Sequence, residues 1–405
     1  MKNYNDSDSN FTSSLLVVGV NTRPIVKSAK DLGLNVIAID CFEDQYISKN
    51  SDALYITEKK SKTSRSEEFL NLAREAIDSY SPDFAIFSSG IEYFPEKVEK
   101  LEKEVKIAGN GPEQFKNCMD EEKLFNIAES LGIPHPKTKR IEDRDEAIEK
   151  AREICFPLLV KPVRRGGGVG IGYVEDEDGL IDVCTNLLSN CDRTDFYIQE
   201  YIDGIDVSAS ILSNGDSAEC LTVNEQIIGA KKLDVPRRFG YCGNVIPYSG
   251  NSETVSKIEN YSEVICEKLK LLGSNGVDFV VKDKPYLIEV NPRLQNTMDM
   301  VELSLGINLL KEHFKSLREE LNETSPILQC SAKLIVYSKE GIKVPNLATF
   351  PDVVDIPKTG SFVKEGEPIC SVLKTGSKRE KVIEGAYGLV KKIQEKIYES
   401  KNSLT

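Results

Sequence analysis

The chain has 405 residues, of which 40% are hydrophobic and 29% are charged, an ordinary composition for a globular protein with two to four domains. Its formal net charge of −13 disfavours nucleic acid or an anionic membrane as a partner. Two histidines are too few for a histidine-rich metal site. The ten cysteines form no CxxC pair, and no apolar run reaches the roughly 20 residues of a membrane span. We therefore expect a cytoplasmic protein.

The first part of the chain predicts a parallel α/β domain over residues 14–111, after a polar tail at 1–13 that we expect to be disordered. A strand at 15–20, a helix ending near residue 32 and a strand at 35–40 make a βαβ unit, which a helix at 66–79 and a strand at 84–87 extend. The first turn lacks the glycines of a dinucleotide fingerprint. Ser89 and Glu92 follow the strand at 84–87, at the edge where open α/β sheets bind ligands.

The rest of the chain predicts a larger mixed α and β region and a β-rich end. We expect helices at 112–131, 145–154, 178–188, 254–272 and 298–317, and strands at 156–162, 196–202 and around 218–233. Short strands are expected at 330–337, 353–357 and 369–374, before a last helix at 385–399.

The stretch GVDFVVKDKPYLIEVNPR, residues 276–293, predicts a hairpin with a polar turn at 282–285. If it closes symmetrically, Asp278 and Glu289 face each other, and Asn291 lies on the same face as Glu289. The other face would present an apolar set to the core: Val277, Phe279, Val281, Tyr286, Ile288 and Val290. Two opposed carboxylates repel, and a cation between them removes that cost. Two carboxylates and an amide oxygen suit Mg²⁺, while the alternative is a half-exposed surface hairpin.

A glycine-rich loop lies between two predicted strands, at Gly166, Gly167 and Gly168. It is not a Walker A loop, which requires GxxxxGK[ST] at a helix start. Its backbone N–H groups can fold over phosphates as a lid, and Lys161, Arg164 and Arg165 bring positive charge beside it. The alternative is a mobile surface hairpin. Lys123, on the helix before this region, is by itself an ordinary solvated lysine.

In order, these motifs resemble the ATP-grasp family over roughly residues 110–320: Lys123, Lys161-Pro and the glycine loop, QEYIDGID at 199–206, and Asp278 with Glu289-Val-Asn291-Pro-Arg293. The phrase FGYCGNVIPY is similar to the predicted ATP-dependent carboligases of the carboxylate–amine ligase branch. The tail after residue 321 resembles the small C-terminal domain of the biotin carboxylase branch. The resemblance implies a pre-ATP-grasp domain at 14–111, an ATP-grasp domain of two α+β lobes at 112–320 with a lid near 155–203, and a small β-rich domain at 321–405.

The resemblance also implies a role for each motif residue. The ATP phosphates would be held by Lys123, Lys161, Arg165 and the three glycines, the adenosine by Gln199, Glu200, Tyr201, Ile202 and Asp206, and Mg²⁺ or Mn²⁺ by Asp278, Glu289 and Asn291. Arg293 would meet the acyl phosphate and, with Lys161, act in catalysis. Candidate substrate contacts are Thr22, Arg23, Ser89, Glu92, Arg237 and Arg238. Asp278 stands where the family often has glutamate, and the segment after Arg293 leaves the acceptor site open.

The implied function is an ATP- and Mg²⁺-dependent ligase that activates a carboxylate as an acyl phosphate for attack by an amine, with cofactor biosynthesis as one setting. Two alternatives stay open. One is a carboxylase that activates bicarbonate, although the chain has no biotin-carrier Met-Lys-Met sequence. The other is a non-catalytic ATP-binding regulatory protein. The expected partners are small-molecule carboxylate and amine substrates. Homodimers are usual in this branch, but the sequence leaves the oligomeric state open.

Overall fold

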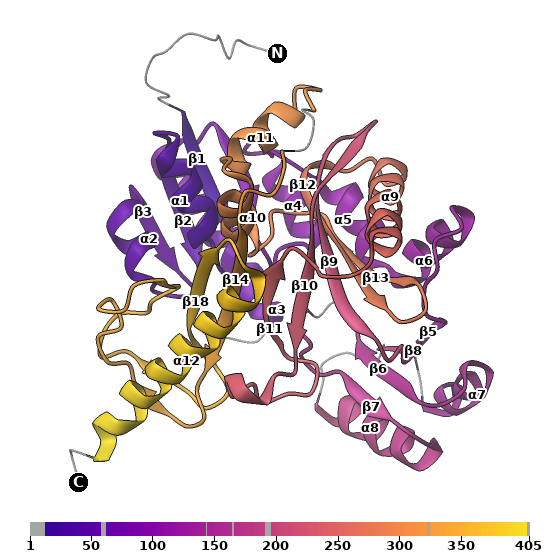
Figure 1. Cartoon of the computed structure of the whole chain (residues 1–405). Coiled ribbons are helices and arrows are strands. Elements are labelled where there is room, and N and C mark those ends of the chain that lie inside the picture. The colour runs from indigo at the N-terminus through magenta and orange to yellow at the C-terminus, as the bar shows by residue number, and fades with distance from the viewer. Residues whose placement is uncertain are drawn as a thin grey trace.

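The computed structural model describes residues 13–57, 62–142, 144–163, 166–190, 196–321 and 325–402. Its strands form a parallel sheet near the N-terminus, a large antiparallel sheet in the centre and a smaller antiparallel sheet beside it (Figure 1). The predicted combination of α/β and α+β parts is therefore confirmed. Among the helices of the described residues, none has the length and hydrophobicity needed to span a membrane.

The parallel sheet has the strand order β3-β2-β1-β4, as the βαβ pattern predicts. Its elements are β1 (Ser14–Val18), α1 (Arg23–Asp31), β2 (Asn35–Asp40), α2 (Gln45–Asn50), β3 (Ala53–Ile56), α3 (Lys62–Tyr80), β4 (Phe84–Phe87) and α4 (Pro95–Leu101). Nearly every residue of β1 and β2 is buried, because helices cover both faces of a parallel sheet. One face packs on α3 and α4, and the other on α1 and on helices from later in the chain.

The smaller sheet, order β5-β8-β6-β7, forms a separate lobe at the lower right of Figure 1. The segment comprises α5 (Pro112–Met119), α6 (Glu121–Ser130), β5 (Thr138–Ile141), α7 (Arg144–Ile154), β6 (Leu158–Pro162), β7 (Gly172–Val174), α8 (Glu177–Asn190) and β8 (Phe196–Glu200). The single helix predicted at 112–131 is wrong. Asp120 has an extended backbone and accepts a hydrogen bond from the Lys123 N–H, so it ends α5 and caps a new helix, α6.

The large sheet runs in the order β13-β12-β9-β10-β11-β14-β18-β16. Its segment contains β9 (Ile205–Asn214), β10 (Ala218–Ile228), the 3-10 helix η1 (Lys231–Leu233), β11 (Tyr241–Ile246), α9 (Ser252–Lys268), β12 (Leu272–Val281), β13 (Pro285–Asn291), α10 (Met298–Leu305) and α11 (Leu309–Ser316). The helix predicted at 298–317 is likewise two helices, because Gly306 takes a left-handed conformation (φ 68°) that ends α10.

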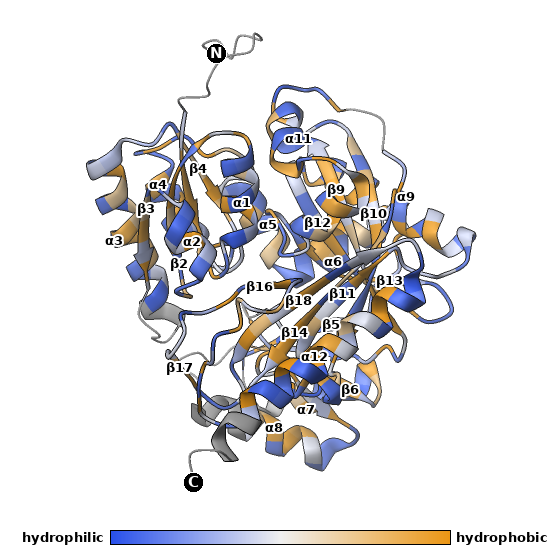
Figure 2. Cartoon of the chain, turned by 60° about the vertical axis from the view of Figure 1, so that its left-hand side comes forward, coloured by the Kyte–Doolittle hydropathy of each residue, from blue (hydrophilic) through white to orange (hydrophobic). Residues whose placement is uncertain are grey.

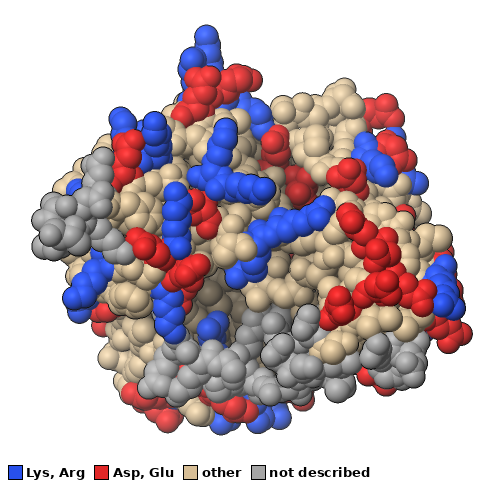
Figure 3. Space-filling view, turned by 90° about the horizontal axis from the view of Figure 1, so that it is seen from below, with Lys and Arg blue, Asp and Glu red and all other residues tan. Residues whose placement is uncertain are grey.

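The C-terminal strands extend this sheet, since β14 pairs with β11. The last elements are β14 (Cys330–Tyr337), β15 (Ile342–Lys343), β16 (Val353–Val354), β17 (Phe362–Val363), β18 (Pro368–Gly376) and α12 (Arg379–Asn402). Hydrophobic residues concentrate on the strands and on the helix faces that meet them (Figure 2). The apolar face of α12 covers β14 and β18, and α9 covers β9 and β10. Basic and acidic side chains are interspersed over the face seen from below (Figure 3).

Candidate functional site

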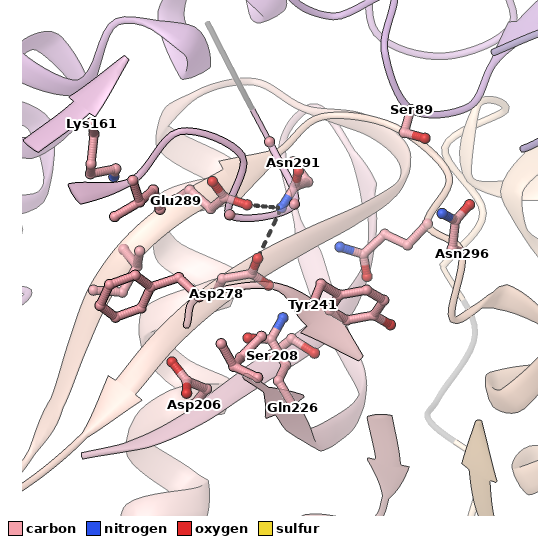
Figure 4. Close-up of a pocket in the computed structure, with 18 of the residues that line it drawn as sticks. Ser89, Lys161, Asp206, Ser208, Gln226, Tyr241, Asp278, Glu289, Asn291 and Asn296 are labelled. Carbon is pink, nitrogen blue, oxygen red and sulfur yellow. Dashed lines mark hydrogen bonds between the residues drawn. The ribbon is translucent and has the colours of Figure 1, made fainter. Parts of the chain in front are cut away.

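A cavity of about 500 Å³ lies where the parallel sheet, the small lobe and the large sheet meet. Its walls come from the loop after β4, from β6 and the glycine loop, from the end of β8 and from one face of β9 to β13. The carboxylates of Asp278 and Glu289 lie in its middle, with Lys161 and Asp206 to one side and Ser89 and Asn296 to the other (Figure 4).

The hairpin of β12 and β13 pairs Asp278 with Glu289, which is the predicted pair, but it does not close symmetrically. Beside the turn the pairing is one residue off the prediction, and a register shift next to Asp278 restores the predicted pairs. Asn291 Nδ2 donates to Asp278 Oδ2 (3.2 Å) and to Glu289 Oε1 (3.1 Å), so the amide lies between the two carboxylates (Figure 4). Asp278 Oδ1 is buried and has no hydrogen-bond partner among the described residues. Burial, and after it the charge of Glu289, raise the pKa of Asp278 well above its usual range.

The predicted apolar face of this hairpin is partly wrong, because the pairing shifts by one residue between Asp278 and Phe279. Phe279 pairs with Leu287, and Leu287 is the residue that packs in the core. Ile288 instead lines the cavity. A bulge of this kind turns one side chain to the other face of its strand, and here it adds an apolar residue to the site beside Glu289.

Lys161 lies at the end of β6 and reaches the cavity, where its Nζ is 2.9 Å from Glu121 Oε1. Glu121 is the first residue of α6 and had no role in the sequence prediction. Burial raises its pKa, while the positive charge of Lys161 opposes that rise. The same carboxylate accepts a hydrogen bond from Gln199 Nε2 at 3.2 Å. Glu121 therefore orients both a predicted phosphate ligand and a residue at the predicted adenosine end.

The glycine loop closes over the cavity between two neighbours. A Cβ on Gly166 would lie 2.2 Å from Tyr93 Oη, and a Cβ on Gly168 would lie 1.7 Å from the carbonyl oxygen of Phe239. Gly168 also has φ of +71°, a conformation that favours glycine. These contacts explain the glycines at these two positions, and they leave backbone N–H groups close to the cavity. Arg165 lies outside the described residues.

The predicted adenosine contacts meet at one end of the cavity, which Gln199, Glu200, Tyr201, Ile202 and Asp206 all line. This end also has an apolar lining suited to the faces of a planar ring: Leu159, Ile171, Ile228, Phe239 and Phe279. Burial raises the pKa of Asp206 to about 6. Sequence reasoning missed the apolar set, since isolated apolar residues carry no signal that separates a cavity wall from a core.

Arg293 lines the opposite end, and its Nε donates to Glu92 Oε1 at 2.8 Å. Its Nη2 also donates to Asn291 Oδ1 at 3.1 Å, which ties it to the carboxylate pair. Glu92 is fully buried and its Oε2 accepts from the Gly90 N–H, so the predicted substrate residue supports Arg293 instead. Ser89 and Tyr93 line this end as well, and Tyr93 was missed although it follows the polar tip of β4.

Four other predicted site residues lie away from the cavity. Lys123 is exposed and its Nζ donates to Asn117. Thr22 is buried and donates to the carboxylate of Asp40. Arg23 is buried in a network with Asp299 and Asp355, which also contains Lys333. The side chain of Arg237 is not among the cavity walls.

Arg238 is the fourth cationic candidate outside the cavity walls. Its guanidinium carbon lies 3.7 Å from the centroid of the Tyr173 ring. The structure therefore gives no support to its assignment as a carboxylate ligand.

The residues around Asp278 fit a divalent cation. The Asp278 and Glu289 carboxylates, one of them with an orphaned buried oxygen, can supply hard oxygen ligands at one point. Asn291 presents its Nδ2 to both carboxylates and its Oδ1 to Arg293, so its amide would have to turn over to add a third oxygen. The described residues contain no group of three or more His, Cys, Asp or Glu side chains placed to hold a metal. With so few protein ligands, a cation here would take its other ligands from phosphate and water, which is the usual pattern for Mg²⁺.

A family model and several known proteins match parts of this chain. Residues 118–297 match the model of the ATP-grasp domain. An uncharacterized protein of Methanocaldococcus jannaschii is 28% identical over 369 residues, which cover 88% of this chain and 87% of that protein. The C-terminal section of the carbamoyl phosphate synthase large chain of Aquifex aeolicus is 28% identical over 230 residues, 54% of this chain. The match spans only 41% of that relative.

Two solved structures share the fold. The biotin carboxylase domain of Hydrogenobacter thermophilus 2-oxoglutarate carboxylase, a dimer in complex with MgADP and bicarbonate, superimposes with a TM-score of 0.73 over 93% of this chain and 89% of that chain, at 16% identity. The L-amino acid ligase of Bacillus licheniformis also reaches 0.73, over 95% and 98%, at 16% identity. Together with the motif order and the cavity, these matches identify the central part of the chain, residues 118–297, as an ATP-grasp domain.

Proposed function

We propose that the protein is an ATP- and Mg²⁺-dependent ligase that activates a carboxylate as an acyl phosphate and transfers the acyl group to an amine, forming ADP and phosphate. The observation that carries the proposal is the half-buried Asp278–Glu289 pair, which shares one cavity with Lys161, the glycine loop and Arg293. A pair of opposed carboxylates destabilises a hairpin unless a cation binds there. A neighbouring lysine and the backbone N–H groups of the glycine loop complement phosphates.

The nucleotide would occupy one end of the cavity, and the substrate carboxylate the other. The adenine ring would lie in the apolar end, with Asp206 accepting from the ribose hydroxyls. The phosphates would extend past Lys161 to the carboxylate pair. Bound Mg²⁺ would screen the charge of the phosphates, and Lys161 and the glycine N–H groups would add to that stabilisation.

The substrate carboxylate would approach from the side of Ser89 and Asn296, where Arg293 is held by Glu92. One of its oxygens attacks the γ-phosphorus, and the bond from that phosphorus to the β–γ bridging oxygen breaks. The amine nitrogen then attacks the acyl carbon, phosphate leaves and the nitrogen loses a proton. The glycine loop would keep water away from the acyl phosphate. Ser89 and Arg293 are thus the substrate contacts that we retain from the sequence.

The test is a screen for ADP release from ATP with pools of carboxylates and amines, followed by mass spectrometry of the product. A product whose mass equals acid plus amine minus water supports the proposal. A second candidate, activation of bicarbonate, is favoured by the fold shared with biotin carboxylase. ADP release that depends on bicarbonate, with no need for an amine, would select it. Tight MgATP binding without ADP release from any pool would instead support a regulatory protein.

A further inference from the structure

Arg238 stands beside the nucleotide end of the cavity, in contact with aromatic rings. Its guanidinium carbon is 3.7 Å from the centroid of Tyr173, 5.9 Å from that of Tyr201 and 5.5 Å from that of Phe239. The Tyr173 and Tyr201 rings meet edge to face with centroids 5.0 Å apart. We call these four residues the Arg238 cluster. Stacking of a guanidinium on an aromatic face is attractive and orients both partners.

The cluster joins two separate parts of the fold. Tyr173 belongs to β7 and Tyr201 directly follows β8, so both move with the small lobe. Arg238 and Phe239 lie on the loop between β10 and β11, in the large sheet. The backbone of that loop is closed by a hydrogen bond from the Gly229 N–H to the Gly240 carbonyl at 2.8 Å.

The loop that carries Arg238 is anchored to the C-terminal part of the chain. Leu233 is fully buried in the core that α12 and β14 form. Asp234 Oδ2 accepts from Gln394 Nε2 of α12 at 2.5 Å, and its Oδ1 is 3.4 Å from Lys339 Nζ. Arg238 is therefore carried by a loop that is tied to the C-terminal part of the chain, whereas Tyr173 and Tyr201 belong to the small lobe.

The same loop touches the glycine loop. The carbonyl of Phe239 lies against Gly168, and Phe239, Tyr201 and Gly168 all line the cavity. The glycine loop runs directly into β7, which carries Tyr173. A shift of Tyr173 away from Arg238 would thus carry the glycine loop away from the cavity.

We propose that Arg238 is a positioning residue that holds β7 and the glycine loop closed over the nucleotide, and that the C-terminal segment contributes to the nucleotide site by fixing the loop that carries Arg238. The identity of the nucleotide rests on the proposed function. The role differs from the carboxylate binding predicted from the sequence, because Arg238 lies outside the cavity walls and stacks on Tyr173.

The first test measures MgADP affinity by calorimetry. Arg238→Ala and Tyr173→Leu each remove the stacking contact and should raise Kd about two- to fivefold, as expected for an exposed guanidinium–ring contact. The double variant should lose no more than Arg238→Ala alone, since that change already removes the contact with Tyr173. Tyr173→Phe keeps the ring and should bind like the wild type. Arg152→Ala removes an exposed arginine of the same lobe, paired only on the outer surface with Glu177, and should also leave Kd unchanged.

The second test needs no nucleotide. In the ligand-free protein, amide hydrogen exchange over residues 166–174 should be faster in Arg238→Ala and Tyr173→Leu than in the wild type and in Arg152→Ala. If the wild type binds no MgADP but exchange responds in this way, the proposed function fails while the positioning role stands. Unchanged exchange together with unchanged Kd in Arg238→Ala would overturn the inference. So would an effect of Arg238→Ala confined to the KM of the carboxylate substrate.

Discussion

Asp278→Asn tests two properties of the carboxylate pair. One is the destabilisation that the pair causes without a metal, and the other is the stabilisation that it gives when Mg²⁺ and nucleotide bind. The asparagine has nearly the same shape, and its side-chain oxygen can still accept from Asn291 Nδ2. What changes is the charge beside Glu289. If the pair exists to bind a cation, the variant should be more stable than the wild type without metal and should fail to gain stability from Mg²⁺ and nucleotide.

The expected gain follows from the hairpin geometry and from burial. Like charges directly opposite each other on paired strands destabilise by up to about 1 kcal/mol, which corresponds to a rise of about 2 °C in the thermal midpoint. The gain should depend on pH. The pKa of Asp278 is raised in the folded state, so this residue destabilises the folded protein at pH values above its unfolded-state pKa. The extra stability of Asp278→Asn should therefore be present at neutral pH. It should shrink as pH falls toward the unfolded-state pKa of Asp278.

The assay is thermal unfolding in EDTA and again with saturating MgADP, at neutral and at acidic pH. Asp283→Asn is the matched control, because Asp283 lies in the exposed turn of the same hairpin and outside the cavity walls. We expect the control to behave like the wild type under all conditions. A metal-free Asp278→Asn protein that is less stable than the wild type, or one that keeps the full MgADP-dependent gain, would show that the Asp278–Glu289 pair does not serve to bind a cation.

Three further predictions concern the neighbouring residues. Gly168→Ala should weaken MgADP binding at least tenfold more than Gly167→Ala in calorimetry, since both positions have positive φ but only the first would press a Cβ against a carbonyl oxygen; equal losses would contradict the close contact. MgADP affinity should rise with pH through about 6 as Asp206 ionises. If Asp206→Asn shows the same pH dependence of MgADP affinity as the wild type, Asp206 does not belong to the nucleotide site. Arg23→Met should destabilise the protein by about 3 kcal/mol in urea unfolding, because it leaves two buried aspartates with one lysine; a loss below about 1 kcal/mol would contradict a structural role for that network.

The hairpin and its Asp278–Glu289 pair were predicted correctly, because alternating apolar and polar residues around a short turn are local information. The register beside the turn was wrong by one residue, since Phe279 pairs with Leu287, and only the bulge restores the predicted pairs beyond it. The bulge that brings Leu287 into the core and Ile288 into the cavity was not predictable, because it depends on packing against the rest of the sheet. Likewise, the order of the motifs indicates the family, but it does not predict how far apart the motif residues lie in the folded protein.

The cationic residues show where sequence reasoning failed. Asp120 interrupts the helix expected around Lys123 and restarts the helical phase, so Lys123 faces solvent and Glu121 faces Lys161. Arg23 and Arg238 stand in suitable parts of the sequence, yet they bind buried aspartates and an aromatic ring. The domain boundaries near residues 111 and 320 stay predictions, and the pairing of β14 with β11 joins the last segment to the large sheet.

Attack of a carboxylate on the γ-phosphate leaves an isotopic record in the released phosphate, which can be measured. The wild-type protein would be incubated with MgATP, amines and a carboxylate pool labelled with ¹⁸O in the carboxyl groups, and the released phosphate analysed by mass spectrometry. When an amine attacks the acyl carbon of an acyl phosphate, the bond from that carbon to the bridging oxygen breaks, and the released phosphate keeps one oxygen of the original carboxylate. We predict ¹⁸O-labelled phosphate in amounts equal to ADP for the wild type, and none for Glu289→Gln. Unlabelled phosphate in amounts equal to ADP, or AMP in place of ADP, would contradict the account.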